Sequence, residues 1–554
     1  MAATVLELAR TADRIAATTS KREKVRLLAE FLARLEGDEL VLATRYFTGG
    51  VFPVGDPRTL SVGGAAFGEL VRAQGIDDAE LSRIWRSHGD SGDWFREVLV
   101  RAGHSGGSAL GVAELDASFK ALSGAGGAKA RTSLLRALID RVGPDEARFI
   151  AKLINGEMRI GLREGLVEEA IVVAFEAEPA QVSRAMMLLG DLGEVAALAA
   201  KRTLHEAAPR WFVPLRPMLA TPVADAAEAI ARLGDEVWVE DKYDGIRCQL
   251  HRRGGRVALF SRDLKDVTAQ FPEVTLGAAL LARDVILDGE VLAFRDGLVM
   301  PFRSLQTRLG RVAPDASVME AVPVIYVAWD LLVEEETVLL DAPLRERRAR
   351  LEALGATDRI ALAHLESVRG AAEVDRRFAD ARARLNEGLL LKQPGSPYTP
   401  GRRGMNWLKL KRPMDTLDVV VIGAEWGHGK RRGVLSDVTF GVRVDGTDEH
   451  VAVGKAYSGL TDAEIADMTK LLLDITITDR GHYRTVRPEI VLEVAFDAVQ
   501  PSSRHRSGYA LRFPRIAHWR HEKPVSEIDT LSRVRQLAEA RDVAHEQRID
   551  VAAD

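Results

Sequence analysis

The chain has 554 residues, a formal net charge of −5 and a single cysteine, Cys248. This length exceeds what one hydrophobic core usually organises, so we expect about three domains. The charge excludes nucleic-acid binding through bulk charge, and one cysteine excludes an internal disulfide and a thiolate zinc cluster. No apolar run approaches the roughly 18 residues of a membrane span. With no apolar signal block at the start, these features predict an intracellular, cytoplasmic protein.

Residues 1–205 are predicted to be helical, because apolar residues recur at three-and-four spacing in runs such as KREKVRLLAEFLARL. Glycine-rich breaks at 104–111 and 123–129 separate these helices. The segment 209–223 carries four prolines, which favours an extended connector.

Residues 206–412 mix the two patterns. Strands are predicted at RVALFSR, DVILDGEVLAF and VPVIYVAWDLLV, and helices at APLRERRARLEAL and VDRRFADARARL. Residues 413–554 are dominated by short β-rich runs, which predict a small barrel or sandwich followed by a charged helix or a frayed tail.

The stretch EVWVEDKYDGIRCQLHRR (236–253) predicts a strand, a turn and a second strand. Lys242 is expected at the strand-to-loop edge, where it can present its amine to a cleft. Taken alone, a surface turn with a solvated lysine is an equal alternative. Cys248, on the second strand, is interpreted as a small buried side chain.

Further charged residues favour a binding site at Lys242 over a solvated surface turn. Asp288 and Glu290 are two apart on a predicted strand, so both carboxylates face one side. Lys409 and Lys411 show the same spacing, and YALRFPRIAHWRHEK (509–523) concentrates arginines. Cations that neutralise phosphate oxygens, with carboxylates that hold Mg²⁺, suit a polyphosphate ligand. The P-loop sequence is absent, so another phosphate-binding solution is required.

Six motifs follow one another along the chain: EDKYDGIR, FSRD, DGE, YVAWDLL, EGLLLK with WLKLK, and ALRFPR. In this order they give the chain a strong resemblance to the ATP-dependent DNA ligases of the covalent nucleotidyltransferase superfamily, in their archaeal and eukaryotic form. The resemblance covers nearly the whole chain. It implies an all-α DNA-binding domain (1–205), an α+β adenylation domain (206–412) and an all-β OB-fold domain (413–554).

The resemblance also implies roles for individual residues. Lys242 is the expected nucleophile toward ATP, assisted by Lys409, Lys411 and Asp244. Glu290 is expected to bind the ribose of the nucleotide or to organise Mg²⁺, and Glu387 is a second candidate Mg²⁺ ligand. Arg159 in GEMRIGL is an expected DNA contact. The remaining nucleotide-binding candidates are Glu240, Arg247, Arg262, Trp329, Lys392, Arg515 and Lys523.

Some expectations carry alternatives. Trp329 replaces the phenylalanine more usual in its motif, and Tyr326 is a second candidate for stacking on adenine. Asp244 has a plain alternative as a turn cap. Nearby cations are expected to lower the pKa of Lys242 and so activate its amine.

Nicked duplex DNA and ATP are the expected partners of a monomeric enzyme. An RNA-capping guanylyltransferase, an RNA ligase and a non-catalytic DNA clamp remain alternatives. An NAD-dependent ligase is disfavoured, because its four-cysteine zinc site cannot be built here.

Overall fold

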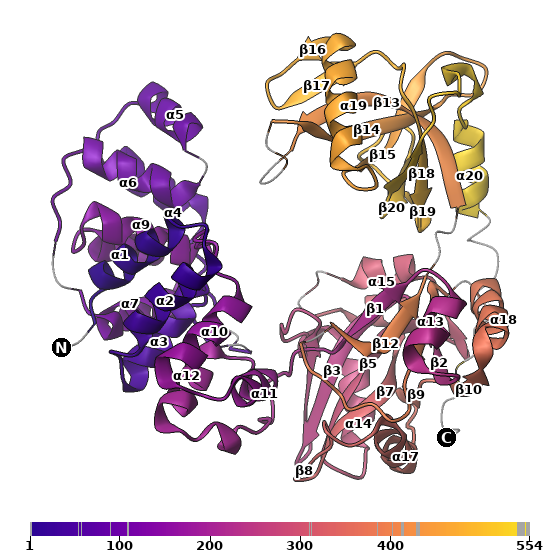
Figure 1. Cartoon of the computed structure of the whole chain (residues 1–554), viewed down its shortest axis with the longest axis horizontal. Helices are drawn as coiled ribbons and strands as arrows, with labels where there is room; N and C mark the ends of the chain where they lie inside the picture. The colour runs from indigo at the N-terminus through magenta and orange to yellow at the C-terminus, as the bar shows by residue number, and fades with distance from the viewer. Residues whose placement is uncertain are drawn as a thin grey trace.

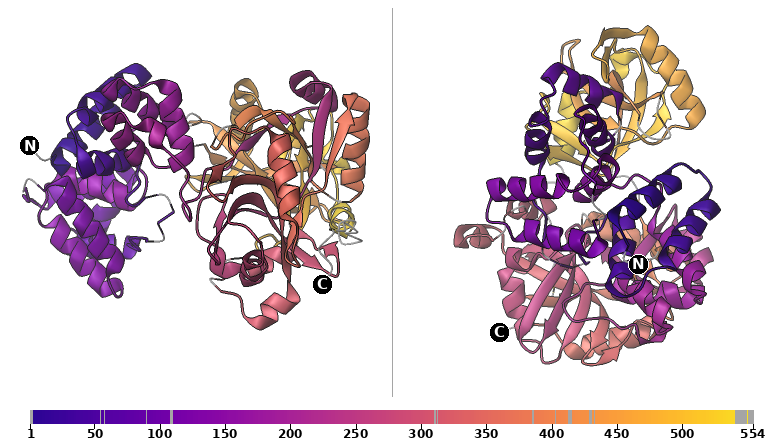
Figure 2. Two further views of the ribbon diagram at one scale, coloured as in Figure 1. Left: turned by 90° about the horizontal axis from the view of Figure 1, so that it is seen from below. Right: turned by 90° about the vertical axis from the view of Figure 1, so that its left-hand side faces the viewer.

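A computed structural model describes residues 3–53, 55–56, 58–88, 90–107, 110–309, 311, 313–384, 386–401, 403–411, 415–427, 431, 433–539 and 549. Figure 1 shows an N-terminal body of helices, a middle body of strands and helices, and a strand-rich C-terminal body. In Figure 2 the helical body lies to one side of the middle body. The expected sequence of fold types is therefore confirmed.

The N-terminal region is helical because its apolar faces meet in one core. Side chains from Ala3 to Leu204 form a single buried cluster. Local signals start the helices: Thr4 and Glu7 form a capping box, and Pro144 occupies the first turn of α9. The helices are α1 Val5–Ala16, α2 Lys21–Leu32, α3 Gly37–Phe47, α4 Gly64–Arg72, α5 Asp78–Ser87, α6 Ser91–Arg101, α7 Val112–Gly124, α8 Ala128–Ile139, α9 Pro144–Ile154, α10 Glu164–Phe175, α11 Pro179–Leu189 and α12 Leu192–Lys201.

The proline-rich connector is held against the middle body. After the short helix η1 (Leu204–Glu206), the backbone N–H of Leu215 donates to Oε1 of Gln249 at 2.8 Å. The N–H of Phe212 donates to Nδ1 of His251 at 3.0 Å. The prediction of one extended connector over 209–223 is wrong at its end, because Leu219–Val223 is strand β1 and pairs in parallel with β12.

Two sheets face each other in the middle body. One sheet has the order β1-β12-β11-β2-β10, and the other has the order β4-β3-β5-β7-β8, with β6 on β5 and β9 on β7. Their strands are β2 Glu236–Lys242, β3 Ile246–Arg253, β4 Arg256–Ser261, β5 Val285–Arg295, β6 Leu298–Val299, β7 Val324–Glu334, β8 Thr337–Val338, β9 Ile360–Leu362, β10 Leu365–Arg369, β11 Gly388–Lys392 and β12 Arg403–Leu410.

Helices cover the outer faces of both sheets. Apolar residues of α13 and α18 bury one face of the first sheet, and α14 and α17 pack on the second. Alternation along each strand then turns the remaining side chains inward, toward the space between the sheets. The helices are α13 Ala226–Leu233, η2 Thr268–Gln270, α14 Pro272–Ala279, α15 Phe302–Arg308, α16 Ala316–Ala321, α17 Leu344–Leu354 and α18 Gly370–Ala383.

The C-terminal body is built around one long strand, β13 (Asp415–Trp426), which pairs with β14, β17 and β18 and so curls the sheet. The other elements are β14 Leu435–Arg443, β15 His450–Ala456, α19 Asp462–Asp474, β16 Thr476–Asp479, β17 Tyr483–Val486, β18 Val491–Phe496, β19 Ala498–Pro501, β20 Tyr509–Arg512, β21 Arg515–Trp519, η4 Val525–Glu527 and α20 Leu531–Glu539. The charged tail thus begins as a helix. Among the described residues, no helix has both the length and the apolar character that crossing a bilayer requires.

Candidate active site

Lys242 is the last residue of β2, and its amine is engaged. Its side chain is 25% exposed and forms an ion pair with Oε2 of Glu387. The Nζ atom of Lys411 lies 3.3 Å from the same Glu387 oxygen. Two lysines therefore converge on one carboxylate. Lys242 is at a strand end, as predicted, but its amine is held in this cluster instead of standing free at the edge of a loop.

The acidic surroundings determine the protonation of this group. Burial alone would lower the pKa of Lys242, but Glu387, Glu290 and Asp244 outweigh burial and raise it. The expectation that neighbouring cations lower this pKa is wrong for the structure as it stands. Burial raises the pKa of Glu387, yet Lys242 and Lys411 prevail and bring it to about 2.

Glu290 lies beside the turn that follows Lys242. Its Oε1 accepts the backbone N–H of Gly245 at 2.8 Å. A Cβ at Gly245 would lie 2.5 Å from the carbonyl oxygen of Val291, so only glycine fits this close approach. Burial raises the pKa of Glu290 to about 7, although Lys242 and the Gly245 N–H act against the rise.

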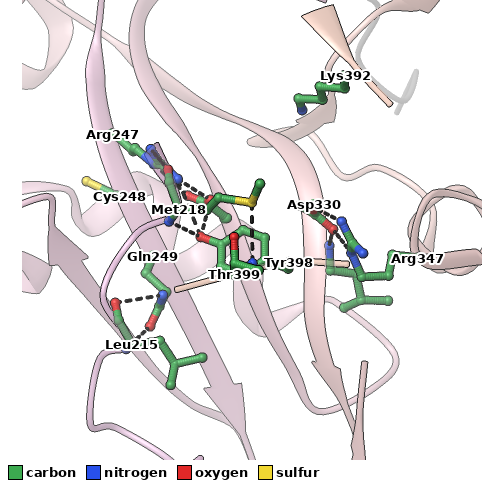
Figure 3. A network of polar contacts seen from close by, with 12 residues as sticks. Leu215, Met218, Arg247, Cys248, Gln249, Asp330, Arg347, Lys392, Tyr398 and Thr399 are labelled. Carbon is green, nitrogen blue, oxygen red and sulfur yellow. Dashed lines mark hydrogen bonds and ion pairs between the residues drawn. The ribbon is translucent and has the colours of Figure 1, made fainter. Parts of the chain in front are cut away.

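Asp288 does not form a metal-binding pair with Glu290. It accepts two hydrogen bonds from Arg247, at 3.0 and 2.6 Å, and a third from the Tyr398 hydroxyl at 2.7 Å. Arg247, Tyr398 and Met218 lie together in Figure 3, and the Met218 carbonyl accepts a hydrogen bond from Arg247 at 2.8 Å. The carboxylate of Asp288 is thus used to orient Arg247.

A buried group of polar side chains occupies the inner face beyond Lys242. The Nζ of Lys392 lies 2.6 Å from Oε2 of Glu240, and both side chains are at most 1% exposed. The same ammonium lies 4.3 Å from the ring centroid of Trp407 and 5.8 Å from that of Trp329. The atoms Glu240 Oε1, Trp329 Nε1 and Trp407 Nε1 are buried without a hydrogen-bond partner among the described residues. One acceptor and two donors beside flat rings suit a purine.

Trp329, and not Tyr326, faces this group. Tyr326 belongs to the core beneath the second sheet, where its hydroxyl donates to the Cys248 carbonyl at 3.0 Å. Trp329 lies three residues on and packs in the core between the sheets, with the Arg247 guanidinium 5.5 Å from its ring. Cys248 is fully buried, as predicted.

Three other candidates lie on different elements. Lys409 of β12 pairs in register with Leu390 of β11, and the exposed Arg262 follows Ser261, the partner of Cys248. Arg159 belongs to the helical body, where it is exposed on the loop between α9 and α10 and pairs with Glu157 at 2.5 Å.

The candidates from the C-terminal region are not in the centre. Arg515 is exposed at the start of β21, and Lys523 pairs with Asp418 of its own region at 2.5 Å.

Two residues outside the predicted site reach the centre from the C-terminal region. Arg512 donates to Oδ2 of Asp244 at 2.8 Å, and Asp497 lies 2.5 Å from Nζ of Lys411. Arg512 was visible as part of a basic cluster, but no sequence signal distinguished it from its neighbours. Nothing in the local sequence indicated Asp497.

The acidic residues fit one type of metal site. Among the described residues, no group of three or more histidine, cysteine or carboxylate ligands is present. Glu290 and Glu387 flank Lys242 and supply two carboxylates. Mg²⁺ usually binds through one or two carboxylates, with waters and substrate phosphates completing its shell. The two residues therefore fit an ion that arrives with a polyphosphate.

Comparison with known protein families finds a match in each of the three bodies. Family models match residues 4–172 ("DNA ligase N terminus"), 217–411 ("ATP dependent DNA ligase domain") and 431–523 ("ATP dependent DNA ligase C terminal region").

Individual proteins match over nearly the whole chain. A "Probable DNA ligase" from Koribacter versatilis is 43% identical over 96% of both chains, and a "DNA ligase" from Archaeoglobus fulgidus is 36% identical over 96% of this chain and 98% of that one. A "Probable DNA ligase" from Opitutus terrae is 41% identical, and this chain spans 62% of its length. The solved structure "Pmar-Lig_PreS3" shares the fold, with a TM-score of 0.58 and 16% identity over 93% of this chain and 99% of that one.

Proposed function

The chain belongs to the ATP-dependent DNA ligase family, and we propose that it seals nicks in duplex DNA through an adenylated Lys242. The ion pair between Lys242 and Glu387, with Lys411 on the same carboxylate, is the observation that carries this assignment. It supports the proposal because a partly exposed amine, a second lysine and a carboxylate lie together, as binding of a triphosphate with its metal requires.

Three phosphoryl transfers follow from this assignment. First, the Lys242 amine attacks the α-phosphorus of ATP and pyrophosphate leaves. Second, an oxygen of the 5′-phosphate at the nick attacks the same phosphorus and the lysine leaves. Third, the 3′-hydroxyl attacks the 5′-phosphorus and AMP leaves, which closes the strand. Each step needs in-line positioning and charge stabilisation more than covalent chemistry from the protein.

The first step needs an uncharged amine, but the pKa of Lys242 is raised in the present arrangement. Glu387 causes much of this rise, so we propose that Mg²⁺ binding at Glu387 and Glu290 relieves it. When bound, the ion would neutralise these carboxylates and the phosphate oxygens. Lys242 has to lose its proton before it attacks, and Lys409 and Lys411 would face the phosphates.

The buried polar group is proposed to read the base. Glu240 Oε1 would accept from the adenine amino group, and the ring of Trp329 would lie against the purine. Arg247, held by Asp288, is assigned to the ribose or α-phosphate together with Arg262. Arg515 and Lys523 are assigned to pyrophosphate, after movement of the C-terminal region.

We further propose domain limits of 1–205, 206–412 and 413–554, and a monomeric cytoplasmic enzyme. Three of the buried clusters, one for each domain, have their core residues within these limits and support the division. Arg159 on its exposed loop is assigned to DNA.

The decisive assay offers the protein ATP or GTP labelled at the α-phosphate. Label should appear on protein from ATP alone, and Lys242→Ala should abolish it while the protein stays folded. Lys242→Arg should fail equally, because a guanidinium stays protonated. Label from GTP would favour a capping enzyme, and sealing of broken RNA in preference to nicked DNA would favour an RNA ligase.

A further inference from the structure

The loop between α9 and α10, residues 155–163, has an unusual backbone. Arg159 adopts φ +52°, a left-handed conformation that residues with a Cβ rarely adopt, between Gly156 at +68° and Gly161 at +69°. Its neighbours Met158 and Ile160 are buried, at 6% and 5% exposure, while Arg159 is exposed. The loop therefore anchors both neighbours of Arg159 in the core and turns Arg159 outward.

Lys24 lies beneath this loop. It belongs to the first turns of α2 and is only 7% exposed. Its Nζ donates to the carbonyl oxygen of Ile160 at 2.6 Å. Within the described ranges, no carboxylate lies at ion-pair distance from this amine. An unpaired buried ammonium is costly, and burial accordingly lowers the pKa of Lys24.

Gly161 shows how closely the amine fits the loop. A Cβ at this position would lie 2.7 Å from the Lys24 Nζ. At the other end of the loop, a Cβ on Gly49 would lie 3.0 Å from the Gly156 carbonyl oxygen. Close backbone approach at both ends, together with the Ile160 hydrogen bond, fixes the path of the chain through Arg159. Helix α2 also packs along α10, which follows the loop (Figure 1).

We propose that Lys24 is the positioning residue of a DNA-contacting loop, and that it sets the direction of Arg159 by holding the Ile160 carbonyl. This inference rests on the proposed function, because it assumes that Arg159 meets DNA. Lys24 itself does not touch the nucleic acid. Its contribution is preorganisation: the loop does not have to be ordered when the phosphate arrives.

Lys24→Met in the full chain tests the proposal, because methionine keeps the length of the side chain and loses the donor. The dissociation constant for nicked duplex should rise about tenfold at 0.15 M salt. Labelling of the protein from ATP should remain unchanged, since the loop is remote from Lys242. Lys21→Met, on the exposed side of the same helix, is the matched control and should change binding less than threefold. An equal effect of both variants would assign the loss to charge alone and overturn the proposal.

The salt dependence of binding separates positioning from direct contact. A residue that neutralises one phosphate contributes roughly 0.9 to the slope of log K against log salt. Lys24→Met should leave this slope unchanged, whereas Arg159→Ala should reduce it by about that amount. In the Arg159→Ala background, Lys24→Met should reduce the slope no further, and a further reduction there would make Lys24 itself a phosphate contact and overturn the positioning role.

A double variant tests whether Lys24 affects DNA binding through Arg159. If Lys24 acts through Arg159, Lys24→Met combined with Arg159→Ala should bind no more weakly than Arg159→Ala alone. Additive losses would overturn the inference. Unchanged binding by Arg159→Ala would instead refute the proposed DNA contact itself, so the two failures are distinguishable.

If Lys24→Met lowers the thermal midpoint by more than a few degrees, Gly161→Ala replaces it. The added Cβ disturbs the same contact from the loop side, and the predicted pattern is identical: weaker nick binding, unchanged slope and intact labelling. Normal nick binding by Gly161→Ala would count against the proposal.

Discussion

Asp497 Oδ2 lies 2.5 Å from the Nζ of Lys411, which joins the C-terminal body to the candidate active site. A second ion pair, at 2.8 Å, has the charges the other way round: the cation Arg512 belongs to the C-terminal body and the anion Asp244 to the middle body. Each region thus offers one cation and one anion to the other. Lys411 is shared between Asp497 and Glu387, so a triphosphate must compete with two carboxylates for it.

Asp497→Asn should therefore improve ATP capture. Removal of one negative charge frees Lys411 for the phosphates, and the Michaelis constant for ATP in self-adenylation should fall about threefold to tenfold. Asp479→Asn is a control, because Asp479 pairs with Arg484 inside the C-terminal body. A higher Michaelis constant for Asp497→Asn would show that Asp497 supports ATP binding instead of opposing it.

The raised pKa of Lys242 predicts a pH dependence. Only the neutral amine attacks, so single-turnover adenylation should accelerate as pH rises toward the Lys242 pKa. Glu387 raises that pKa, so Glu387→Gln should move the midpoint of the profile to lower pH while the maximal rate falls. The measurement is the rate of label transfer between pH 6 and 10, over which the wild-type rate should keep rising with pH whereas that of Glu387→Gln should begin to level off. An equally steep rise in both proteins would remove Glu387 as the group that tunes Lys242.

His251 predicts a separate effect on stability. It is fully buried, and burial lowers its pKa to about 3 from 6.5. Below pH 6.5 the unfolded chain binds a proton at this residue and the folded chain does not. Stability is therefore complete above pH 6.5 and declines as pH falls toward 3, by about 1.4 kcal/mol per pH unit.

The comparison with His251→Asn isolates this contribution, because all other titrating groups are common to both proteins. The variant should be less stable at pH 7.5, since asparagine can still accept from the Phe212 N–H but loses the Nε2 contact with Oε1 of Gln249 at 2.8 Å. The difference in thermal midpoint should shrink at pH 5. A constant difference would mean that His251 keeps an ordinary pKa.

Part of this site was predictable from the resemblance and from local alternation. Glu240 was predicted from its motif position two residues before Lys242, and this spacing on β2 turns both side chains to one face whatever the tertiary fold. Lys409 and Lys411 have the same spacing at the end of β12. The same rule separates Trp329 from Tyr326, which are three residues apart on β7 and face opposite sides.

Pairings between distant segments were not predictable in this way. Asp288 was grouped with Glu290 as a metal ligand by its spacing, but its partners Arg247 and Tyr398 come from other strands and loops. The buried ion pair of Asp330 with Arg347 likewise joins β7 to α17 (Figure 3). Such partners depend on sheet register, which a single sequence leaves open.

Deletion of residues 1–205 should leave self-adenylation largely intact and weaken nick binding, with a smaller salt dependence because phosphate contacts are lost. The junction to the middle body and its connector includes surface ion pairs, Arg184 with Asp341, Arg216 with Glu164 and Arg210 with Glu194, and Leu188 packs into the core between the sheets. Equally tight nick binding by the truncated protein would require another purpose for the helical body.

A variant of Arg515 should impair the first chemical step and spare the last. It is exposed at the start of β21, whereas Arg512 is already bound to Asp244. If Arg515 orients pyrophosphate only after the C-terminal body moves, Arg515→Ala removes a charge-assisted contact that exists only in the ATP complex. Adenylation should then fall by roughly ten- to a thousandfold, as for the loss of one preorganised donor.

Sealing of a pre-adenylated nick should survive in the same variant, because that step releases AMP and involves no pyrophosphate. The assay compares ATP-driven ligation with sealing of pre-adenylated DNA, protein for protein. Arg504→Ala, on the turn before β20, is a suitable surface control and should be normal in both assays. Equal losses of both activities in Arg515→Ala would place Arg515 in DNA binding or in folding of the C-terminal body, because only a role confined to pyrophosphate spares the final step.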